Sequence, residues 1–285
     1  MSRLILRSPA KLNLFIKVLN KRPDGFHNIQ TLFERIDLCD RIILRANRSG
    51  KINLFCDHPA LRQIKSNLVY RAAYLLKHRC RVSQGVDIHL IKNIPVAAGL
   101  GGGSGNAATT LLGLNRLWSL GLSNKRLLMY GNQLGSDVPF FLTQTSWALG
   151  KGRGDIIRPL DLKRKVWHVL VAPRMKIYSR EVFMSLNLQL TKKNDDVNIL
   201  IHNLRNNNIY KIKQNFFNEL EWGILKVCPR LAAVKRRISE MTRLPVSFSG
   251  SGPSLFCVTD SRKEALRISQ KLKSHYSRVY LVGTM

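Results

Sequence analysis

The stretch Pro95-Val-Ala-Ala-Gly-Leu-Gly-Gly-Gly-Ser-Gly-Asn-Ala-Ala-Thr109 decides how this sequence is interpreted. Before it, the apolar residues Val86, Ile88 and Leu90 alternate with other residues, which predicts a strand. After it, the residues from about Ser104 to Trp118 are spaced as in a helix. Glycines let the backbone turn tightly and point its N–H groups at one place, where the helix N-terminus adds the positive end of its dipole. The stretch therefore predicts a phosphate-binding loop rather than a flexible turn.

Two common nucleotide-binding loops do not fit this stretch. No Gly-Lys-Ser or Gly-Lys-Thr follows the glycines, so the loop is not of the Walker A type. A dinucleotide-binding fold needs regular Gly-x-Gly-x-x-Gly spacing and an acidic residue about 20 positions further on. Here the spacing is imperfect, and Lys125 and Arg126 stand in that region.

The stretch resembles the second motif of the GHMP kinases, Pro-x-x-x-Gly-Leu-Gly-x-x-Ser. The places of that motif are filled by Pro95, Gly99, Leu100, Gly101 and Ser104, while Gly105 stands where relatives usually carry a second serine. In that family the loop wraps the phosphates of ATP, and the serine lies near the magnesium ion. The resemblance therefore implies ATP and Mg²⁺ as cofactors, with a magnesium contact from Ser104. The ATP-binding residues that it implies are Pro95, Val96, Ala97, Ala98, Gly99, Leu100, Gly101, Gly102, Gly103, Ser104 and Gly105.

A lysine near the N-terminus matches the first motif of the same family. The segment Ser8-Pro-Ala-Lys-Leu-Asn13 lies in a β-like region, where Lys11 and Asn13 have the same side-chain parity and can face one cleft. A lone lysine on a strand usually faces solvent. In the GHMP kinases, however, this lysine reaches the reacting centre and the asparagine lies beside the substrate hydroxyl. The resemblance implies these roles for Lys11 and Asn13.

An aspartate before an apolar run is a further candidate. Asp137 lies in Gly135-Ser-Asp-Val-Pro-Phe-Phe141, in a chain with only 17 acidic residues. By itself it could equally be a helix cap or a turn residue. The position matches the catalytic aspartate of the GHMP kinases, which implies that Asp137 takes the proton of the attacking alcohol beside Lys11. A third Gly-rich motif, Phe248-Ser-Gly-Ser-Gly-Pro-Ser254, resembles the family loop that closes beside the nucleotide phosphates.

The segment Arg22-Pro-Asp-Gly-Phe-His27 narrows the resemblance within the superfamily. It resembles the Arg-Pro-Asp-Gly-Tyr-His signature of the cytidine-diphosphate-methylerythritol kinases, with Phe26 in place of tyrosine. An aromatic ring can stack on a pyrimidine, and a histidine can hydrogen-bond its edge. Phe183 stands where that family has the second aromatic ring, so Phe26 and Phe183 are expected to enclose a cytosine that His27 recognises. The segment Asn218-Glu-Leu-Glu221 resembles the Asn-Asp-Leu-Glu of the same family.

The pattern of elements predicts an α+β protein of two parts. Helical spacing is found at 67–80, 104–118, 125–134, 215–226, 229–240 and 262–273. Strands are expected at 4–18 with a break at Ser8-Pro9, at 32–44 around a polar turn at Cys39-Asp40, at 166–171 and at 254–259. We divide the chain into residues 1–154 and 155–285. The resemblance implies a two-domain GHMP kinase fold, with a ferredoxin-like C-terminal domain and the active site in the cleft between the domains.

The charge of the chain is its most unusual property. The 285 residues include 47 Lys and Arg against 17 Asp and Glu, a formal net charge of +30. Such a field attracts polyanions of any kind. We find no basic tail and no aromatic platform with interleaved basic residues, so we expect no specific nucleic acid and no membrane as partner. The five scattered cysteines and the lack of a long apolar segment predict a cytoplasmic protein.

The resemblance implies an ATP-dependent kinase that phosphorylates the 2-hydroxyl of a cytidine-diphosphate sugar alcohol in non-mevalonate isoprenoid synthesis. Its partners would be small-molecule substrates, and it would act as a monomer or homodimer. Another GHMP kinase, of the homoserine or mevalonate type, is the nearest alternative. A basic RNA-binding protein is the alternative from a different class, with the net charge as its sole support.

Overall fold

The computed structural model describes residues 2–61, 63–186 and 196–285. Its contacts group the chain into two compact units, each built from separate segments of the sequence. The first unit contains residues 1–10, 38–96 and 101–145, and the second contains residues 11–37, 97–100 and 146–285. The long strands β1 (Arg3–Lys21) and β2 (His27–Asn47) each contribute residues to both units. The sequence-based division after Gly154 stays a prediction.

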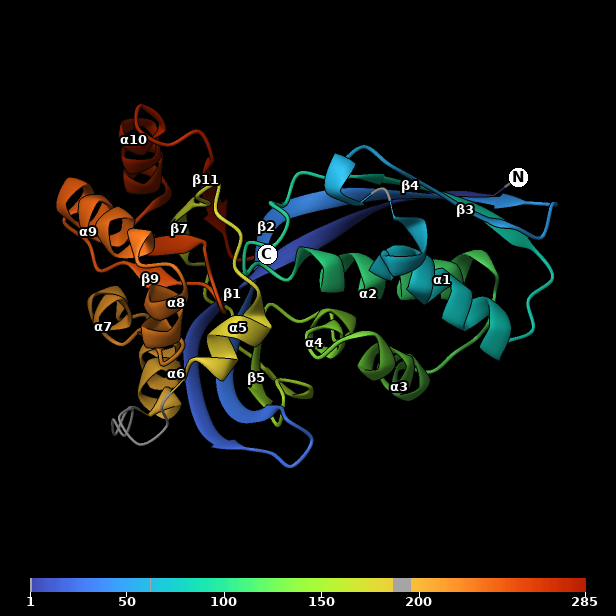
Figure 1. Cartoon of the computed structure of the whole chain (residues 1–285), viewed down its shortest axis with the longest axis horizontal. Coiled ribbons are helices and arrows are strands. Elements are labelled where there is room, and N and C mark those ends of the chain that lie inside the picture. The colour runs from blue at the N-terminus through green and yellow to red at the C-terminus, as the bar shows by residue number, and fades with distance from the viewer. Residues whose placement is uncertain (1, 62, 187–195) are drawn as a thin grey trace. The chain divides into compact units, whose positions relative to one another are not determined.

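The first unit is a sheet covered by helices. Strand β4 (Gly85–Ile91) runs antiparallel to β2 and parallel to β3 (Ile52–Cys56). Figure 1 shows the helices on one face of this sheet. They are α1 (Leu68–Arg79), α2 (Gly102–Leu117), α3 (Asn124–Leu134) and α4 (Val138–Leu142), and two short 3-10 turns, Pro59–Leu61 and Ile64–Ser66, precede α1. The inner face of α2 is fully buried at Ala107, Leu111 and Leu114.

The second unit contains an antiparallel sheet of its own, in the order β11-β7-β10-β9. These strands are β11 (Val279–Gly283), β7 (Trp167–Val171), β10 (Leu255–Thr259) and β9 (Ser247–Phe248). The unit's helices are α5 (Ser179–Met184), α6 (Val197–Arg205), α7 (Ile209–Gln214), α8 (Glu221–Val227), α9 (Arg230–Thr242) and α10 (Arg262–Lys273). Its core joins residues of the sheet, such as Val169 and Leu255, to Ile224, Leu231 and Ile268 on the helices.

Three more strands of the second unit complete its β-structure. Strand β5 (Trp147–Lys151) pairs with β2 at Thr31–Glu34 and with β6 (Ile156–Leu160). The two-residue strand β8 (Phe217–Asn218) runs parallel to β1, opposite Phe15 and Ile16. This pairing brings Asn218 next to the strand that carries Lys11.

Three sequence-based predictions about elements were wrong. The expected turn at Cys39-Asp40 is part of the continuous strand β2, because the buried Asp40 accepts hydrogen bonds from the backbone N–H groups of Asn93 and Ile94 and pairs with Lys92. Strand β1 likewise runs without a break through Ser8-Pro9. The helix expected from residue 215 begins at Glu221. The remaining predicted helices, at residues 67–80, 104–118, 125–134, 229–240 and 262–273, are confirmed within a few residues.

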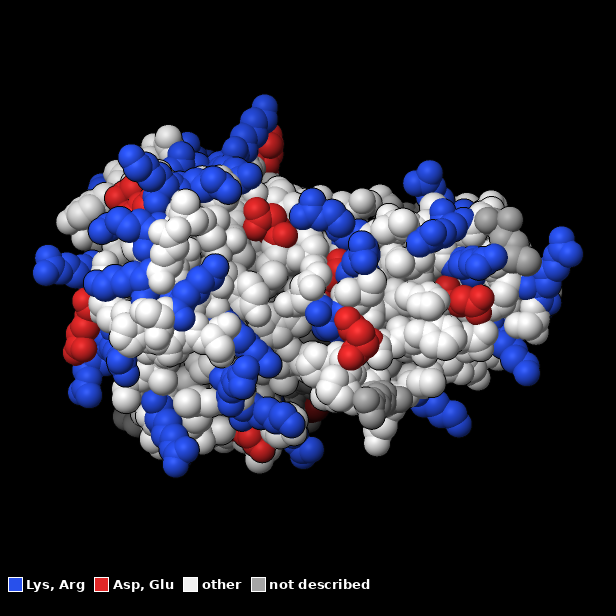
Figure 2. Space-filling view, turned by 90° about the horizontal axis from the view of Figure 1, so that it is seen from above, with Lys and Arg blue, Asp and Glu red and all other residues white. Residues whose placement is uncertain are grey.

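Basic side chains cover much of the surface. Figure 2 shows a face on which Lys and Arg are spread widely and Asp and Glu are few. Among the described residues, no helix is long and apolar enough to cross a membrane.

Candidate active site

Lys11 and Asn13 lie side by side on β1 and are almost completely buried, with 4% and 3% of their surfaces exposed. The Lys11 ammonium donates a hydrogen bond to Asn13 Oδ1, which confirms that the two side chains share one side of the strand. Asn13 Nδ2 in turn donates to Thr31 Oγ1 at 2.8 Å, and that hydroxyl donates to the carbonyl oxygen of Phe15 at 2.7 Å. This chain of bonds fixes the Asn13 amide with its oxygen toward Lys11.

The first part of the Gly-rich stretch passes next to Lys11. The backbone N–H of Lys11 donates to the carbonyl oxygen of Leu100 at 3.0 Å. Gly99 has a φ of +73°, which favours glycine, and its carbonyl oxygen accepts a hydrogen bond from Ser249 Oγ at 3.0 Å. A Cβ atom at Gly99 would lie within 3.0 Å of the Ser249 carbonyl oxygen, closer than real Cβ atoms come. The second and third sequence motifs are therefore in contact at Gly99 and Ser249.

The third motif also reaches the lysine. A Cβ atom on Gly250 would lie 3.2 Å from Asn13 Oδ1 and 3.4 Å from Lys11 Nζ, and Gly250 has a φ of +58°. Segments near residues 11, 99 and 250 thus meet in the second unit around one ammonium group, which also lies 5.4 Å from the centroid of the Phe33 ring. A buried cation ringed by backbone and an amide can stabilise negative charge on a reacting group.

Asn218 holds the third motif in place. Its Nδ2 donates to the carbonyl oxygens of Phe248 and Gly250, each at 2.9 Å, and its Oδ1 accepts from the N–H of Leu220 at 3.0 Å. The sequence pointed to this asparagine through a weak resemblance alone, and its contacts give it a positioning role. The amide uses both donor hydrogens and its acceptor on backbone groups, so its orientation is fixed.

In the first unit, the rest of the Gly-rich stretch begins a helix. Gly101, with a φ of +65°, is the N-cap of α2, and Gly102 is its first residue. The N–H groups of this first turn and the helix dipole favour an anion, as the phosphate-binding loop requires, and binding of a phosphate there stays a prediction. Ser104 lies in the same turn, and a Cβ atom on Gly135 would be 3.9 Å from its Oγ. Ser104 is therefore close to the turn that carries Asp137.

Asp137 stands at the N-cap position of α4, yet its side chain makes no capping hydrogen bond. The helix-cap alternative for this aspartate therefore does not apply, while its alternative as a turn residue is not tested by this observation. Lys11 belongs to the second unit and Asp137 to the first, so their meeting stays a prediction.

Gly105, the departure from the family pattern, has a steric reason. A Cβ atom at this position would lie 2.5 Å from the carbonyl oxygen of Pro9 and 3.4 Å from Ser8 Oγ. Ser8 Oγ donates to Asn106 Oδ1 at 2.7 Å, which packs β1 directly against α2. The second serine of the family motif has no room in this chain.

Of the three predicted base-binding residues, all in the second unit, His27 and Phe183 are in direct ring contact. The His27 ring stacks on Phe183, with centroids 5.3 Å apart and an interplanar angle of 23°. This spacing is that of a direct ring pair, so no base fits between the two. Phe26 is 53% exposed, and Arg153 Cζ lies 5.0 Å from its ring centroid. The enclosure of a cytosine by Phe26 and Phe183 stays a prediction, and Arg153 is a neighbour that the sequence did not indicate.

The turn before Phe26 is held by its own polar residues. Asp24 accepts hydrogen bonds from the Arg22 guanidinium and from the N–H of Phe26 at 3.1 Å, and Gly25 has a φ of +82°. Burial, with a smaller contribution from the positive charge of Lys21, lowers the pKa of His27 below its ordinary value of 6.5. His27 is therefore neutral at pH 7 and can both donate and accept a hydrogen bond.

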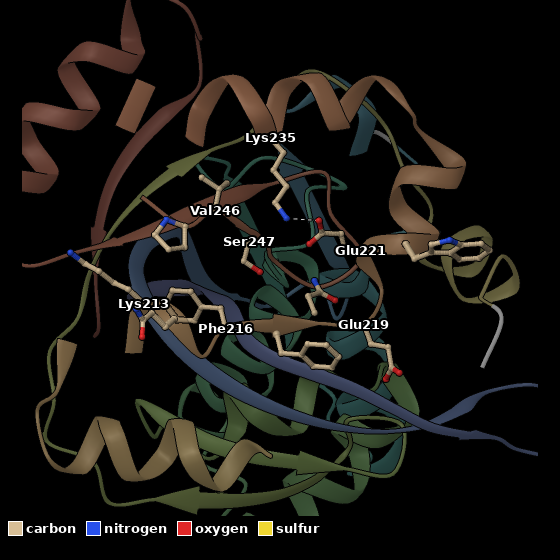
Figure 3. Close-up of a pocket in the computed structure, with 12 residues that line it drawn as sticks. Lys213, Phe216, Glu219, Glu221, Lys235, Val246 and Ser247 are labelled. Atoms are coloured by element: carbon tan, nitrogen blue, oxygen red, sulfur yellow. Dashed lines mark hydrogen bonds and ion pairs between the residues drawn. The ribbon is translucent and has the colours of Figure 1, made fainter. Parts of the chain in front are cut away.

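A pocket of about 740 Å³ lies beside Asn218, behind the third motif, and was not predicted from the sequence. Figure 3 shows Lys235 and Glu221 pointing toward each other across it, where they form an ion pair. The other lysine of the pocket, Lys213, pairs with Asp260 at 2.7 Å. Because both lysines have acidic partners, this pocket is not a strong site for an anion.

The described residues contain no group of three or more His, Cys, Asp or Glu side chains that could hold a metal ion. Mg²⁺ is commonly bound through one or two protein ligands together with substrate phosphates and water. The Ser104 hydroxyl, beside the N-terminus of α2, fits a magnesium site of this kind, in which the protein supplies only one or two ligands.

Two family models match the chain. The GHMP kinases N terminal domain matches residues 67–145, and the GHMP kinases C terminal domain matches residues 200–278. These ranges include α1 to α4 in the first unit and α7 to α10 in the second.

Two relatives and one solved structure match the chain over nearly its whole length. The chain is 37% identical over 286 residues to a 4-diphosphocytidyl-2-C-methyl-D-erythritol kinase of Alkaliphilus oremlandii (strain OhILAs), covering 100% of this chain and 97% of the relative. It is 38% identical over 280 residues to the enzyme of that name from Bacillus velezensis, covering 98% and 96%. A crystal structure of 4-(cytidine 5'-diphospho)-2C-methyl-D-erythritol kinase matches 99% of this chain and all of its own, with 30% identity and a TM-score of 0.85. The α+β, two-domain GHMP kinase fold is confirmed, and the chain belongs to the 4-diphosphocytidyl-2-C-methyl-D-erythritol kinase family.

Proposed function

We propose that this chain transfers the γ-phosphoryl group of ATP to the 2-hydroxyl of 4-diphosphocytidyl-2-C-methyl-D-erythritol, a step of non-mevalonate isoprenoid synthesis. The observation that carries the proposal is the convergence of three motifs, at Lys11, Gly99 and Gly250, around one buried ammonium group. Two relatives of this name match the chain over 97% and 96% of their length, which supports the choice of acceptor.

The Gly-rich stretch from Pro95 to Gly105 is the proposed ATP site. Its last residues form the first turn of α2, where backbone N–H groups point away from the helix and attract phosphate oxygens. We propose that Ser104 would supply a hydroxyl ligand to Mg²⁺, which would contribute positive charge to offset that of the phosphates. The glycines allow the phosphates to come close to the backbone.

Asp137 is the proposed proton acceptor, and Lys11 is the proposed partner that offsets negative charge. A carboxylate beside the attacking hydroxyl can accept its proton as the new bond to phosphorus forms. The fixed amide of Asn13 would orient that hydroxyl, since its position next to the Lys11 ammonium is locked by Thr31. Positioning and charge stabilisation supply most of the catalysis in phosphoryl transfer.

The cytidine group is proposed to bind at the rings of Phe26, His27 and Phe183. Phe183 packs half-buried against the core of the second unit, which gives it a rigid backing. Phe26 is exposed and lies next to the Arg153 side chain, so its ring can turn onto a base without disturbing the core. We also propose a cytoplasmic enzyme, monomeric or homodimeric, with small molecules as its substrates.

An ADP-release assay with a panel of alcohols tests the proposal. The purified chain, ATP and Mg²⁺ are mixed separately with the cytidine-diphosphate substrate, with homoserine and with mevalonate. The proposal requires turnover with the cytidine substrate and a kcat/KM for the other two lower by orders of magnitude. Preferred turnover of homoserine or mevalonate would assign the chain to one of the other GHMP kinase activities.

A further inference from the structure

One face of helix α1 carries a row of aromatic rings that the proposed kinase reaction does not use. Tyr70, Tyr74 and His78 follow one another at intervals of four residues, so they lie on the same side of the helix. The rings of Tyr70 and Tyr74 stack with centroids 6.2 Å apart at 24°, and those of Tyr74 and His78 are 4.0 Å apart at 40°. Tyr74 is 49% exposed although it is a large ring. We call these three residues the aromatic row.

Basic side chains surround the aromatic row. Lys65, Arg71 and Arg79 line a pocket of about 760 Å³ together with the row and with Gln133 and Leu134 of α3. All three cations are exposed, and in the described part of the chain none of them forms an ion pair. Lys77 of the same helix differs, because it donates to three backbone carbonyl oxygens and is thus a structural residue.

The stretch of sequence that carries the row contains little negative charge. Between His58 and Ser136 the sequence has a single acidic residue, Asp87. The Asp87 carboxylate accepts hydrogen bonds from Asn47 and Asn53 on the strands. The positive potential at the row is therefore not cancelled locally, and it will attract a polyanion.

We propose that the aromatic row and its three cations bind single-stranded RNA without sequence specificity. The rings of the row lie too close together for a base to enter between them, so unpaired bases would stack on its two ends, Tyr70 and His78, while Lys65, Arg71 and Arg79 contact the phosphates. Charge alone would fit an anionic membrane equally well, but a membrane has no flat bases to match a row of stacked rings. A duplex hides its bases and would use the cations alone. The sequence did not reveal this surface because a spacing of four residues indicates a helix, and the rings become neighbours only once that helix has formed.

Binding of a fluorescein-labelled 12-nucleotide oligouridylate to the full chain, followed by fluorescence anisotropy, tests the stacking. Tyr74→Leu keeps an apolar side chain but removes the middle ring that holds Tyr70 and His78 in one stack, and should weaken binding about tenfold. Tyr74→Phe keeps the ring and should bind like the wild type. Tyr210, which is 68% exposed on α7, provides the control Tyr210→Leu, which should change the Kd less than twofold. Equal effects of Tyr74→Leu and Tyr210→Leu would overturn the proposal.

The salt dependence of the same Kd tests the cations. For single strands the slope of log K against log salt is about −0.7 per phosphate contact, so Arg71→Gln should reduce its size by about 0.7. Arg267→Gln removes an equal charge from an exposed helix elsewhere and should leave the slope nearly unchanged. Phosphatidylglycerol vesicles serve as the second probe. Vesicle binding that is as strong as RNA binding and equally sensitive to Tyr74→Leu would contradict recognition of bases.

Discussion

The imidazole of His27 stacks on the ring of Phe183, although the two residues come from the start of β2 and from α5. The contact buries part of the His27 ring, and that burial lowers its pKa. We predict that NMR titration of His27 gives a midpoint below 6.5. As the pH falls, the imidazole is protonated in the unfolded chain before it is protonated in the folded chain. The contribution of His27 to the free energy of unfolding is therefore present above pH 6.5 and is lost as the pH falls through the lowered pKa.

The same titration has a consequence for substrate binding. The neutral imidazole offers one donor and one acceptor, and the protonated form has lost the acceptor. The KM for the cytidine substrate should therefore stay flat from pH 8 to pH 7 and rise only below the lowered pKa of His27. A midpoint at or above 6.5, or a KM that rises already at pH 7, would contradict this account.

Removing the ring of Phe183 should separate the two substrates. Phe183→Ala is predicted to raise the KM for the cytidine substrate by about tenfold or more, since base stacking contributes roughly 1–3 kcal/mol. The KM for ATP should be nearly unchanged. Phe55→Ala removes an exposed ring of the first unit and is the control, for which neither KM should move. Equal rises in both KM values for Phe183→Ala would show that Phe183 is not a substrate residue.

Gly99 provides a test of the contact between the second and third motifs. In Gly99→Ala the new methyl group would be forced against the Ser249 carbonyl oxygen, so the loop must move. We expect ATP binding, measured by calorimetry, to weaken at least tenfold. Gly121→Ala is a matched control, because Gly121 has a similar φ of +63° but no atom within 4 Å of the new methyl group. If the two variants bind ATP equally well, the contact is not needed for the nucleotide site.

Replacing Gly105 by the serine of the family motif should destabilise the folded chain. Gly105→Ser places a Cβ atom 2.5 Å from the Pro9 carbonyl oxygen, in a buried contact between α2 and β1. Overpacking of this kind typically costs about 1–3 kcal/mol. We predict a lower free energy of unfolding and no gain in kcat, by denaturant titration and the ADP-release assay. A stable variant with raised kcat would mean that a hydroxyl is missing at this position.

The sequence predicted the helices well because most of them carry clear apolar periodicity. In the structure, the Asn67 side chain caps α1 and the Ser261 side chain caps α10. Prediction from the sequence failed at Cys39-Asp40, since a polar pair looks like a turn until the later residues that satisfy it are placed beside it. The convergence at the site could not be worked out from spacing. Gly99 and Ser249 are 150 positions apart, and nothing in the local pattern of either segment specifies the other.

Resemblance to a family supplied the roles of Lys11 and Asp137, whereas the role of Asn218 emerged only from its contacts. An asparagine amide can bond two carbonyl oxygens in many settings, and the sequence does not say which ones lie within reach. The contact between His27 and Phe183 also emerged only from the structure, because it depends on how the turn at Gly25 folds.

The measurement that tests the central claim most directly is ³¹P NMR of the reaction of the chain with ATP, Mg²⁺ and 4-diphosphocytidyl-2-C-methyl-D-erythritol. The account predicts a new phosphomonoester resonance that grows together with the resonances of ADP. In Asp137→Asn, which keeps the size of the side chain but removes the base, the same resonance should grow about 10² to 10⁴ times more slowly. Absence of the new resonance with the wild-type chain, or its formation at a near-normal rate by Asp137→Asn, would contradict the account.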